Sequence, residues 1–193
     1  MTETQSEESE PREKGWNNTQ RMVVSAFAVF AVFAGALAFL FPLLQPRGAH
    51  FRRSTRDLSN LKQLDLGLIM YASDFDDIYP RTSKWMDDIQ PYVKNELILH
   101  SIELTPPDRA PTRTDPYGFA FRKSLASVNS AKLSTPEQVA VIFDSSDLSR
   151  NASGELNLLP SPPRHQDGGR PFNFIGFVDG HVKAFRMPLV GVK

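Results

Sequence analysis

An unbroken apolar stretch near the amino terminus constrains this chain more than any other feature. From Met22 to Leu44 the sequence contains no charged residue, histidine, asparagine or glutamine. As a helix rising about 1.5 Å per residue it would be roughly 35 Å long, enough to cross a hydrocarbon core of about 30 Å. A helix of a soluble domain would keep a polar face. The stretch therefore predicts a transmembrane helix over residues 22–44, with a cleaved signal peptide as the alternative.

The apolar stretch divides the chain into segments of different character. Residues 1–21 are polar and acidic, which predicts a disordered tail. Residues 45–56 contain Pro46, Gly48 and several arginines, and we expect a kink and a juxtamembrane linker there. The length of the remainder suits one folded domain over residues 57–187, followed by a short tail at 188–193.

Composition excludes several kinds of site. The chain has no cysteine, so disulfides, thiolate zinc sites and thiol nucleophiles are ruled out. It has 22 basic and 22 acidic residues, and this balance predicts no electrostatic surface for nucleic acid. Basic residues flank the apolar stretch on both sides in nearly equal numbers, so charge does not define its orientation in a membrane.

Apolar residues recur every three or four positions after the arginine-rich linker. They are Leu58, Leu61, Leu64, Leu68, Tyr71 and Phe75. This spacing predicts an amphipathic helix from Asp57 to Phe75 that ends before Pro80. A second, short helix is expected to begin with Ser83 as its N-cap. The side chains that it would bury are Trp85, Ile89 and Tyr92.

The rest of the chain reads as strands and loops. Residues 117–121 and 138–143 are short aromatic or β-branched runs, as in strands. Residues 172–178 and 181–186 flank an Asp179-Gly180 pair, which predicts a hairpin with a two-residue turn. We expect three or four antiparallel strands packed on the amphipathic helix. The predicted fold class is α+β, with an N-terminal transmembrane helix and an amphipathic stalk helix on a small antiparallel sheet.

Two groups of side chains are candidate ligands for a divalent cation. They are Asp74, Asp76 and Asp77 after the stalk helix, and His165, Asp179 and His181 around the hairpin. Carboxylates suit a hard cation such as calcium, although the aspartate spacing is not that of an EF-hand loop. Imidazole with carboxylate suits zinc or another divalent ion. The competing interpretation is that the aspartates serve a helix end and turns. No other cofactor is expected.

No catalytic motif is found in the sequence. The glycine-flanked serine of hydrolases, the zinc-protease motif, the phosphate loop and the dinucleotide-binding glycines are all missing. Asp144, Ser145 or Ser146, and His165 could be assembled into a Ser-His-Asp set, but such a set is defined by geometry. We therefore expect a protein that is not an enzyme, with an extracytoplasmic hydrolase as the third hypothesis.

The order of several short blocks resembles the pilin-like pseudopilins of the DUF1559, or H-X9-DG, type, as found in planctomycetes. The blocks are Leu58-Ser59-Asn60-Leu61-Lys62-Gln63, Met70-Tyr71, Asp74-Phe75-Asp76-Asp77 with Pro80, Pro91-Tyr92-Val93-Lys94-Asn95, Pro136-Glu137, Arg164-His165 and Val178-Asp179-Gly180-His181-Val182-Lys183. The resemblance covers roughly residues 52–185. It implies a pilin-like fold displayed outside the cytoplasmic membrane.

The chain departs from this family at three places. The interval between His165 and Asp179 is longer than in the family. Two positions that are usually cysteine in the family correspond to Asp57 and Ser101, so a linkage between them, if the family has one, is lost. The sequence around Gly15 imitates a prepilin cleavage site, yet Gln20 stands where a prepilin has glutamate. This last departure argues against the usual processing and entry into a fibre.

Together these features predict a single-pass, membrane-anchored, pseudopilin-type structural or assembly protein. Its location would be the cytoplasmic (inner) membrane, with the C-terminal domain outside the cytoplasm. Its expected partners are the lipid bilayer and secretion or pilus-like assembly subunits, and no nucleic acid. The alternative is an anchored extracytoplasmic module that binds a cation or ligand through the residues named above.

Overall fold

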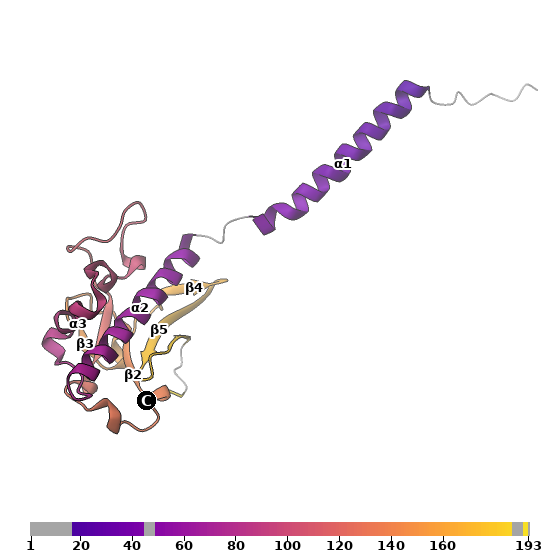
Figure 1. Ribbon diagram of the computed structural model, residues 1–193. Coiled ribbons are helices and arrows are strands. Elements are labelled where there is room, and N and C mark those ends of the chain that lie inside the picture. The colour runs from indigo at the N-terminus through magenta and orange to yellow at the C-terminus, as the bar shows by residue number, and fades with distance from the viewer. Residues whose placement is uncertain (1–16, 45–48, 187–190, 193) are drawn as a thin grey trace, which may run out of the picture. The chain divides into compact units, whose positions relative to one another are not determined.

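The computed structural model describes residues 17–44, 49–186 and 191–192 and separates the chain into two units, 1–46 and 47–193. The first unit contains α1 (Asn18–Leu44), and the second contains the folded head (Figure 1). The predicted tail at 1–16 and most of 188–193 lie outside the described residues. Residues 18–21, also predicted to be disordered, belong instead to α1.

Helix α1 begins before the apolar stretch because its first turn is capped. The Gln20 backbone N–H donates to Asn17 Oδ1 at 2.8 Å, and the Asn17 N–H donates to Gln20 Oε1 at 3.1 Å, forming a reciprocal capping box. Gln20 is thus part of a helix cap. Over Asn18–Leu40 the mean hydropathy is 2.5 and no residue is buried. Among the described residues, α1 is one helix that is long enough and apolar enough to cross a membrane. Membrane spans and signal sequences both meet this criterion.

The head begins with α2 (Ala49–Asp74), which starts within the segment predicted to be a linker. That prediction was wrong for residues 49–56, because contacts made by the first turns with distant loops hold them in the helix. The predicted stripe is confirmed at Leu61, Leu64 and Leu68, which are fully buried. Phe75 lies past the end of the helix and is 52% exposed, so the buried stripe ends at Ala72 instead.

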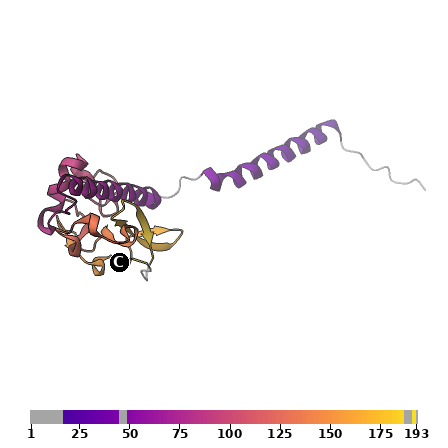
Figure 2. The ribbon, with the colours of Figure 1, turned by 60° about the horizontal axis from the view of Figure 1, so that its bottom comes forward.

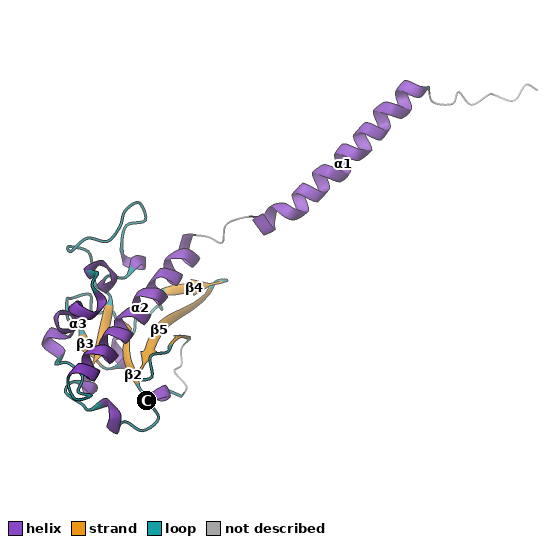
Figure 3. Ribbon diagram, in the orientation of Figure 1, coloured by secondary structure: helices purple, strands orange, loops and turns teal. Residues whose placement is uncertain are grey.

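The head contains a mixed six-stranded sheet. Its strands are β1 (Phe119–Arg122), β2 (Ala140–Asp144), β3 (Ser153–Gly154), β4 (His165–Asp167), β5 (Arg170–Phe177) and β6 (Val182–Phe185). The order is β3-β1-β2-β5-β4, and β6 also pairs with β5 (Figure 3). The expectation of a purely antiparallel sheet was wrong, because β1 and β3 pair in parallel while the other pairs are antiparallel.

Side chains of the central strands point alternately to the two faces of the sheet, and both faces are buried. Ile142 of β2 faces the cluster formed with α2, and Phe143 faces a second cluster closed by the loop around Leu158. Figure 2 shows α2 lying along one side of the strands. The amphipathic helix is therefore covered by the sheet, as its pattern required.

The second helix and the hairpin differ from prediction in detail. Helix α3 (Trp85–Val93) has no side-chain cap, because Ser83 lies in a preceding 3₁₀ turn, and Tyr92 is only half-buried. Trp85 and Ile89 are fully buried as expected. The β5–β6 hairpin is confirmed, but its turn has three residues, 178–180. Gly180 there has a φ of +86°, as a type I turn closed by a left-handed residue requires.

Candidate functional site

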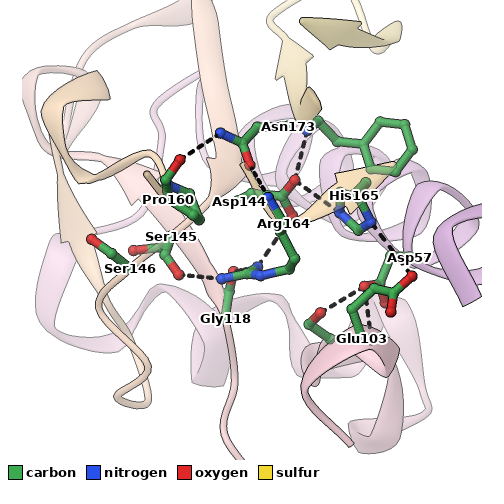
Figure 4. A network of polar contacts seen from close by, with 12 residues as sticks. Asp57, Glu103, Gly118, Asp144, Ser145, Ser146, Pro160, Arg164, His165 and Asn173 are labelled. Atoms are coloured by element: carbon green, nitrogen blue, oxygen red, sulfur yellow. Dashed lines mark hydrogen bonds and ion pairs between the residues drawn. The ribbon is translucent and has the colours of Figure 1, made fainter. Parts of the chain in front are cut away.

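A buried polar network joins the sheet to the first turns of α2 (Figure 4). Its central residue is Asp144, the last residue of β2, which is fully buried. Asp144 Oδ2 accepts a hydrogen bond from the Phe174 N–H at 2.6 Å and lies 3.0 Å from His165 Nε2. Asp144 Oδ1 lies 3.3 Å from Arg164 Nη1. One carboxyl group thus contacts β5, β4 and the residue before β4.

Arg164 binds the carboxyl end of β2 to the segment before β1. Its guanidinium donates to the carbonyl oxygen of Gly118 at 2.5 Å and to that of Ser145. The loop that carries Arg164 is held by Asn173, whose Oδ1 accepts from the Arg164 N–H at 2.9 Å and whose Nδ2 donates to the Pro160 carbonyl at 3.0 Å. The Arg164 side chain is 6% exposed, so its charge is balanced by Asp144 inside the head and not by solvent.

His165 carries the network from the sheet to α2. Its ring packs between Phe172, with ring centroids 5.5 Å apart, and Phe174, with centroids 4.6 Å apart. His165 Nδ1 lies 3.3 Å from Ser54 Oγ, and Ser54 Oγ donates to Glu103 Oε1 at 3.1 Å. Arg53 Nε then contacts Glu103 Oε2 at 3.3 Å. The first turns of α2 are therefore tied to both the sheet and the loop at Glu103.

Asp57 adds a second connection between α2 and the same loop. Its carboxyl group accepts from Ser101 Oγ at 2.6 Å, from the Ile102 N–H at 2.5 Å and from the Glu103 N–H at 3.2 Å. These bonds cap the 3₁₀ helix Ile102–Leu104. Burial raises the pKa of Asp57 to about 6, against the lowering effect of the hydrogen bonds from Ser101 and Ile102.

Asp57 and Ser101 are also the two positions that the family resemblance aligned with cysteines. The structure places their side chains in direct contact and leaves both residues fully buried. A hydrogen bond between side chains therefore joins the two positions.

We predict that a double variant, Asp57→Cys with Ser101→Cys, forms an intramolecular disulfide on mild oxidation. The reason is that the side-chain oxygens lie 2.6 Å apart, so the two side chains point at each other and the new thiols would meet. Because the parent chain has no cysteine, mass spectrometry of alkylated protein reads the bond directly. The pair Lys62→Cys with Lys132→Cys, at two exposed positions, is the control. Free thiols in a folded double variant would contradict this geometry.

Ser54, His165 and Asp144 lie in the order of a hydrolase triad, but they are closed off from solvent. Their exposed fractions are 5%, 1% and 0%. The Ser54 hydroxyl donates to Glu103 rather than to the imidazole. A nucleophile must reach its substrate, so we interpret this line of residues as a structural connection between the helix and the sheet.

The serines considered from the sequence are not part of this line. Asp144 and His165 do pair, as that set required. Ser145 Oγ accepts from the Asp147 N–H at 3.0 Å, and Ser146 Oγ donates to the Leu158 carbonyl at 2.9 Å. Both hydroxyls therefore serve the loop after β2, and the set built from them is wrong in this geometry.

The three aspartates after α2 do not converge. Asp74 Oδ2 accepts from the Tyr92 hydroxyl at 2.8 Å. Asp76 and Asp77 are exposed turn residues with φ of 55° and 62°, and their carbonyl oxygens accept from Asn129 and Ser130. The competing interpretation, a helix end with a turn, describes their roles here.

The residues around the hairpin are separated as well. His165 pairs with Phe172 at one end of β5, whereas Asp179 and His181 lie beyond Phe177 at the other end. At about 3.3 Å per residue this places them roughly 16 Å apart. Asp179 Oδ1 contacts His181 Nδ1 at 2.5 Å, and the His181 ring stacks on Phe177. Among the described residues no group of three or more His, Asp or Glu side chains is placed to hold a metal ion.

Asp65 is a buried acid that the sequence interpretation missed. It is fully buried under Gly176 of β5, where an added Cβ would lie 3.0 Å from Asp65 Oδ2. Neither carboxyl oxygen makes a hydrogen bond of good geometry among the described residues, and the nearby Phe177 N–H lowers the pKa only in part. Burial first, and the charge of Asp179 second, raise the pKa of Asp65 well above its ordinary value. The signal was present, because Asp65 follows Leu61 by four positions and precedes Leu68 by three, within the apolar stripe.

Comparisons with known proteins add no relative to this description. A search of protein-family models, curated proteins and solved structures found no significant match to the chain. The pseudopilin resemblance thus stays a prediction that depends on the sequence blocks. The architecture itself is α+β, with an N-terminal apolar helix and a mixed six-stranded sheet.

Proposed function

We propose that the chain is a single-pass, membrane-anchored structural protein of the pseudopilin type, whose head contacts other subunits. One observation carries the proposal: an apolar helix with no buried residue is followed, after four residues, by an amphipathic helix that packs on a sheet. This is the order of elements that a pilin-like protein needs. The ordered sequence blocks from residue 58 to 183 support the same conclusion.

The proposed mechanism is mechanical. Helix α1 anchors the chain in the cytoplasmic membrane, and α2 carries the head outside the cytoplasm. The network at Asp144 and the capping bonds of Asp57 hold α2 on the head from both the sheet and the loop at Glu103. Because the ties lie in the first turns of α2, force applied through the anchor would be passed to the sheet rather than unwinding the helix.

The exposed side of α2 is the proposed contact surface for a second copy or a related subunit. Leu66 and Met70 lie one helical turn apart there and are 55% and 43% exposed. Beyond the end of α2, Phe75 stacks on Tyr71 and is half exposed, which extends the apolar surface. Copies held by anchors in one bilayer share an orientation, so these surfaces meet without a large loss of rotational freedom.

We predict that Leu66→Ser with Met70→Ser reduces subunit crosslinking in native membranes by about fivefold or more while leaving the head folded. Removing two exposed apolar side chains weakens a contact by about 1–3 kcal/mol without opening a cavity. The control pair is Leu97→Ser with Leu148→Ser, which are 39% and 40% exposed elsewhere on the head.

Fractionation tests the proposal as a whole. The full chain should stay with the membrane after alkaline extraction and should be released by detergent. Sequencing its amino terminus then shows whether it is cut after Gly15, as a fibre subunit would require. A chain recovered in the aqueous fraction, or crosslinking that both serine pairs leave equal to wild type, would contradict the proposed role.

A further inference from the structure

A cleft of about 240 Å³ opens beside the first turns of α2. One wall is formed by Arg52, Arg53 and Arg56, and the other by Arg109 together with prolines of the loop that follows the 3₁₀ helix Ile102–Leu104. Arg52 and Arg53 each lie about one helical turn before Arg56, so the three arginines share one side of the helix. Four guanidinium groups therefore line one small cleft.

Two of these guanidinium groups are held in place by acids. Arg53 contacts Glu103 at 3.3 Å and also donates to the carbonyl oxygens of Ile102 and Thr105. Arg109 donates to both carboxyl oxygens of Asp115, at 2.5 and 2.6 Å. These contacts balance two of the four charges and fix the shape of the cleft.

The other two cations are not balanced. Arg52 and Arg56 are exposed and have no acidic partner among the described residues. The remaining acid of the facing loop, Asp108, is exposed and offsets part of this charge. The cleft thus keeps an excess of positive charge, presented by the side chain that binds phosphate oxygens in pairs.

The position of the cleft in the chain indicates which phosphate it meets. Helix α2 begins at Ala49, five residues after Leu44, the last residue of α1. A fully extended chain covers at most about 3.6 Å per residue, so the linker allows these two ends to lie at most roughly 18 Å apart. Lipid headgroups add several ångströms on each side of the hydrocarbon core. A cleft in the first two turns of α2 is therefore within reach of the headgroup layer when α1 spans the membrane.

We propose that this arginine cleft binds the phosphate group of an anionic phospholipid in the leaflet from which α1 emerges. The inference rests on the proposed membrane anchoring. Arg53 and Arg109 shape the cleft, and Arg52 and Arg56 supply the charge that the lipid phosphate neutralises. The bound lipid would hold the head close to the bilayer surface.

The test uses the full chain, reconstituted in vesicles of phosphatidylcholine and phosphatidylglycerol and released in mild detergent. Native mass spectrometry then measures how much phosphatidylglycerol is retained relative to phosphatidylcholine. We expect wild type to retain phosphatidylglycerol preferentially. Arg52→Gln with Arg56→Gln should lower the preference by about fivefold for each arginine removed. Lys62→Gln with Lys132→Gln, two exposed residues away from the cleft, removes the same charge and should leave the preference unchanged.

The outcomes separate the two proposals. A membrane-bound chain whose arginine variant keeps the wild-type lipid preference would overturn the lipid site alone. Equal loss in the lysine pair would overturn it too, because the effect would then come from net charge. Displacement of phosphatidylglycerol by inorganic phosphate would assign the cleft to free phosphate instead. A chain that alkaline extraction removes from the vesicles would overturn the membrane anchoring as well.

Discussion

Replacing Asp144 by alanine is expected to destabilise the head by about 3–5 kcal/mol, the effect of removing one partner from a buried ion pair. The variant leaves the Arg164 guanidinium, which is 6% exposed, without its carboxylate. It also leaves the buried N–H of Phe174 without an acceptor and removes the contact with His165. The Phe174 N–H would be buried without a partner, and the buried Arg164 charge would keep only the carbonyl oxygens of Gly118 and Ser145, which makes both groups costly.

The measurement is chemical unfolding of the full chain in mild detergent, followed by tryptophan fluorescence in a Trp16→Phe background, so that the signal comes from Trp85, which is fully buried. Asp147→Ala is the matched control, because Asp147 lies three residues away and accepts only from Ser149 in its own loop. The control should cost less than about 1 kcal/mol, as for a local hydrogen bond near the surface. If the two variants lose similar stability, the network does not hold the head together.

Raising the pH from about 4 to about 6 is expected to lower the free energy of unfolding by about 2 kcal/mol through Asp57 alone. Burial raises the pKa of Asp57 from 3.8 to about 6 in the folded head. The folded state therefore binds the Asp57 proton more tightly than the unfolded state does. The stabilisation is complete below a pH near 3.8 and is lost as the pH rises through about 6.

Other carboxyl groups change the total pH dependence, so the comparison must isolate Asp57. Asp65 acts in the same direction, because burial raises its pKa. Asp115 and Asp147 act in the opposite direction at lower pH, since hydrogen bonds, chiefly from Arg109 and Ser149 respectively, lower their pKa values. The quantity to measure is the difference in unfolding free energy between Asp57→Asn and wild type, because the common contributions cancel. A difference that does not change between about pH 4 and pH 6 would rule out this role for Asp57.

The sequence predicted those elements of the fold that local residue patterns define. The spacing from Leu58 to Leu68 predicted the stalk helix, and the residues around Gly180 predicted the β5–β6 hairpin. Strand β3 consists of two residues, Ser153 and Gly154, with no pattern of their own, so the parallel pair could not be foreseen. The early start of α2 also depends on contacts with distant segments.

The polar network could be predicted only in fragments. The sequence suggested a pairing of Asp144 with His165. Ser54 lies 111 positions before His165, and only the fold brings Ser54 and His165 together. The hairpin metal hypothesis shows the opposite case. His165 and His181 are close in sequence, but they lie beside opposite ends of β5, so the fold keeps them apart. Asp65 was predictable in principle, as an acid at a position where the helical pattern calls for an apolar residue.

The contact between Asp57 and Ser101 affects how the head matures. A disulfide at this position would require an oxidant for folding and could be opened by reductants. The hydrogen bond seen here needs no thiol chemistry, so the head can reach its final form in reducing or oxidising surroundings. The corresponding sensitivity is to proton concentration, because the carboxyl group that closes this contact has a pKa of about 6.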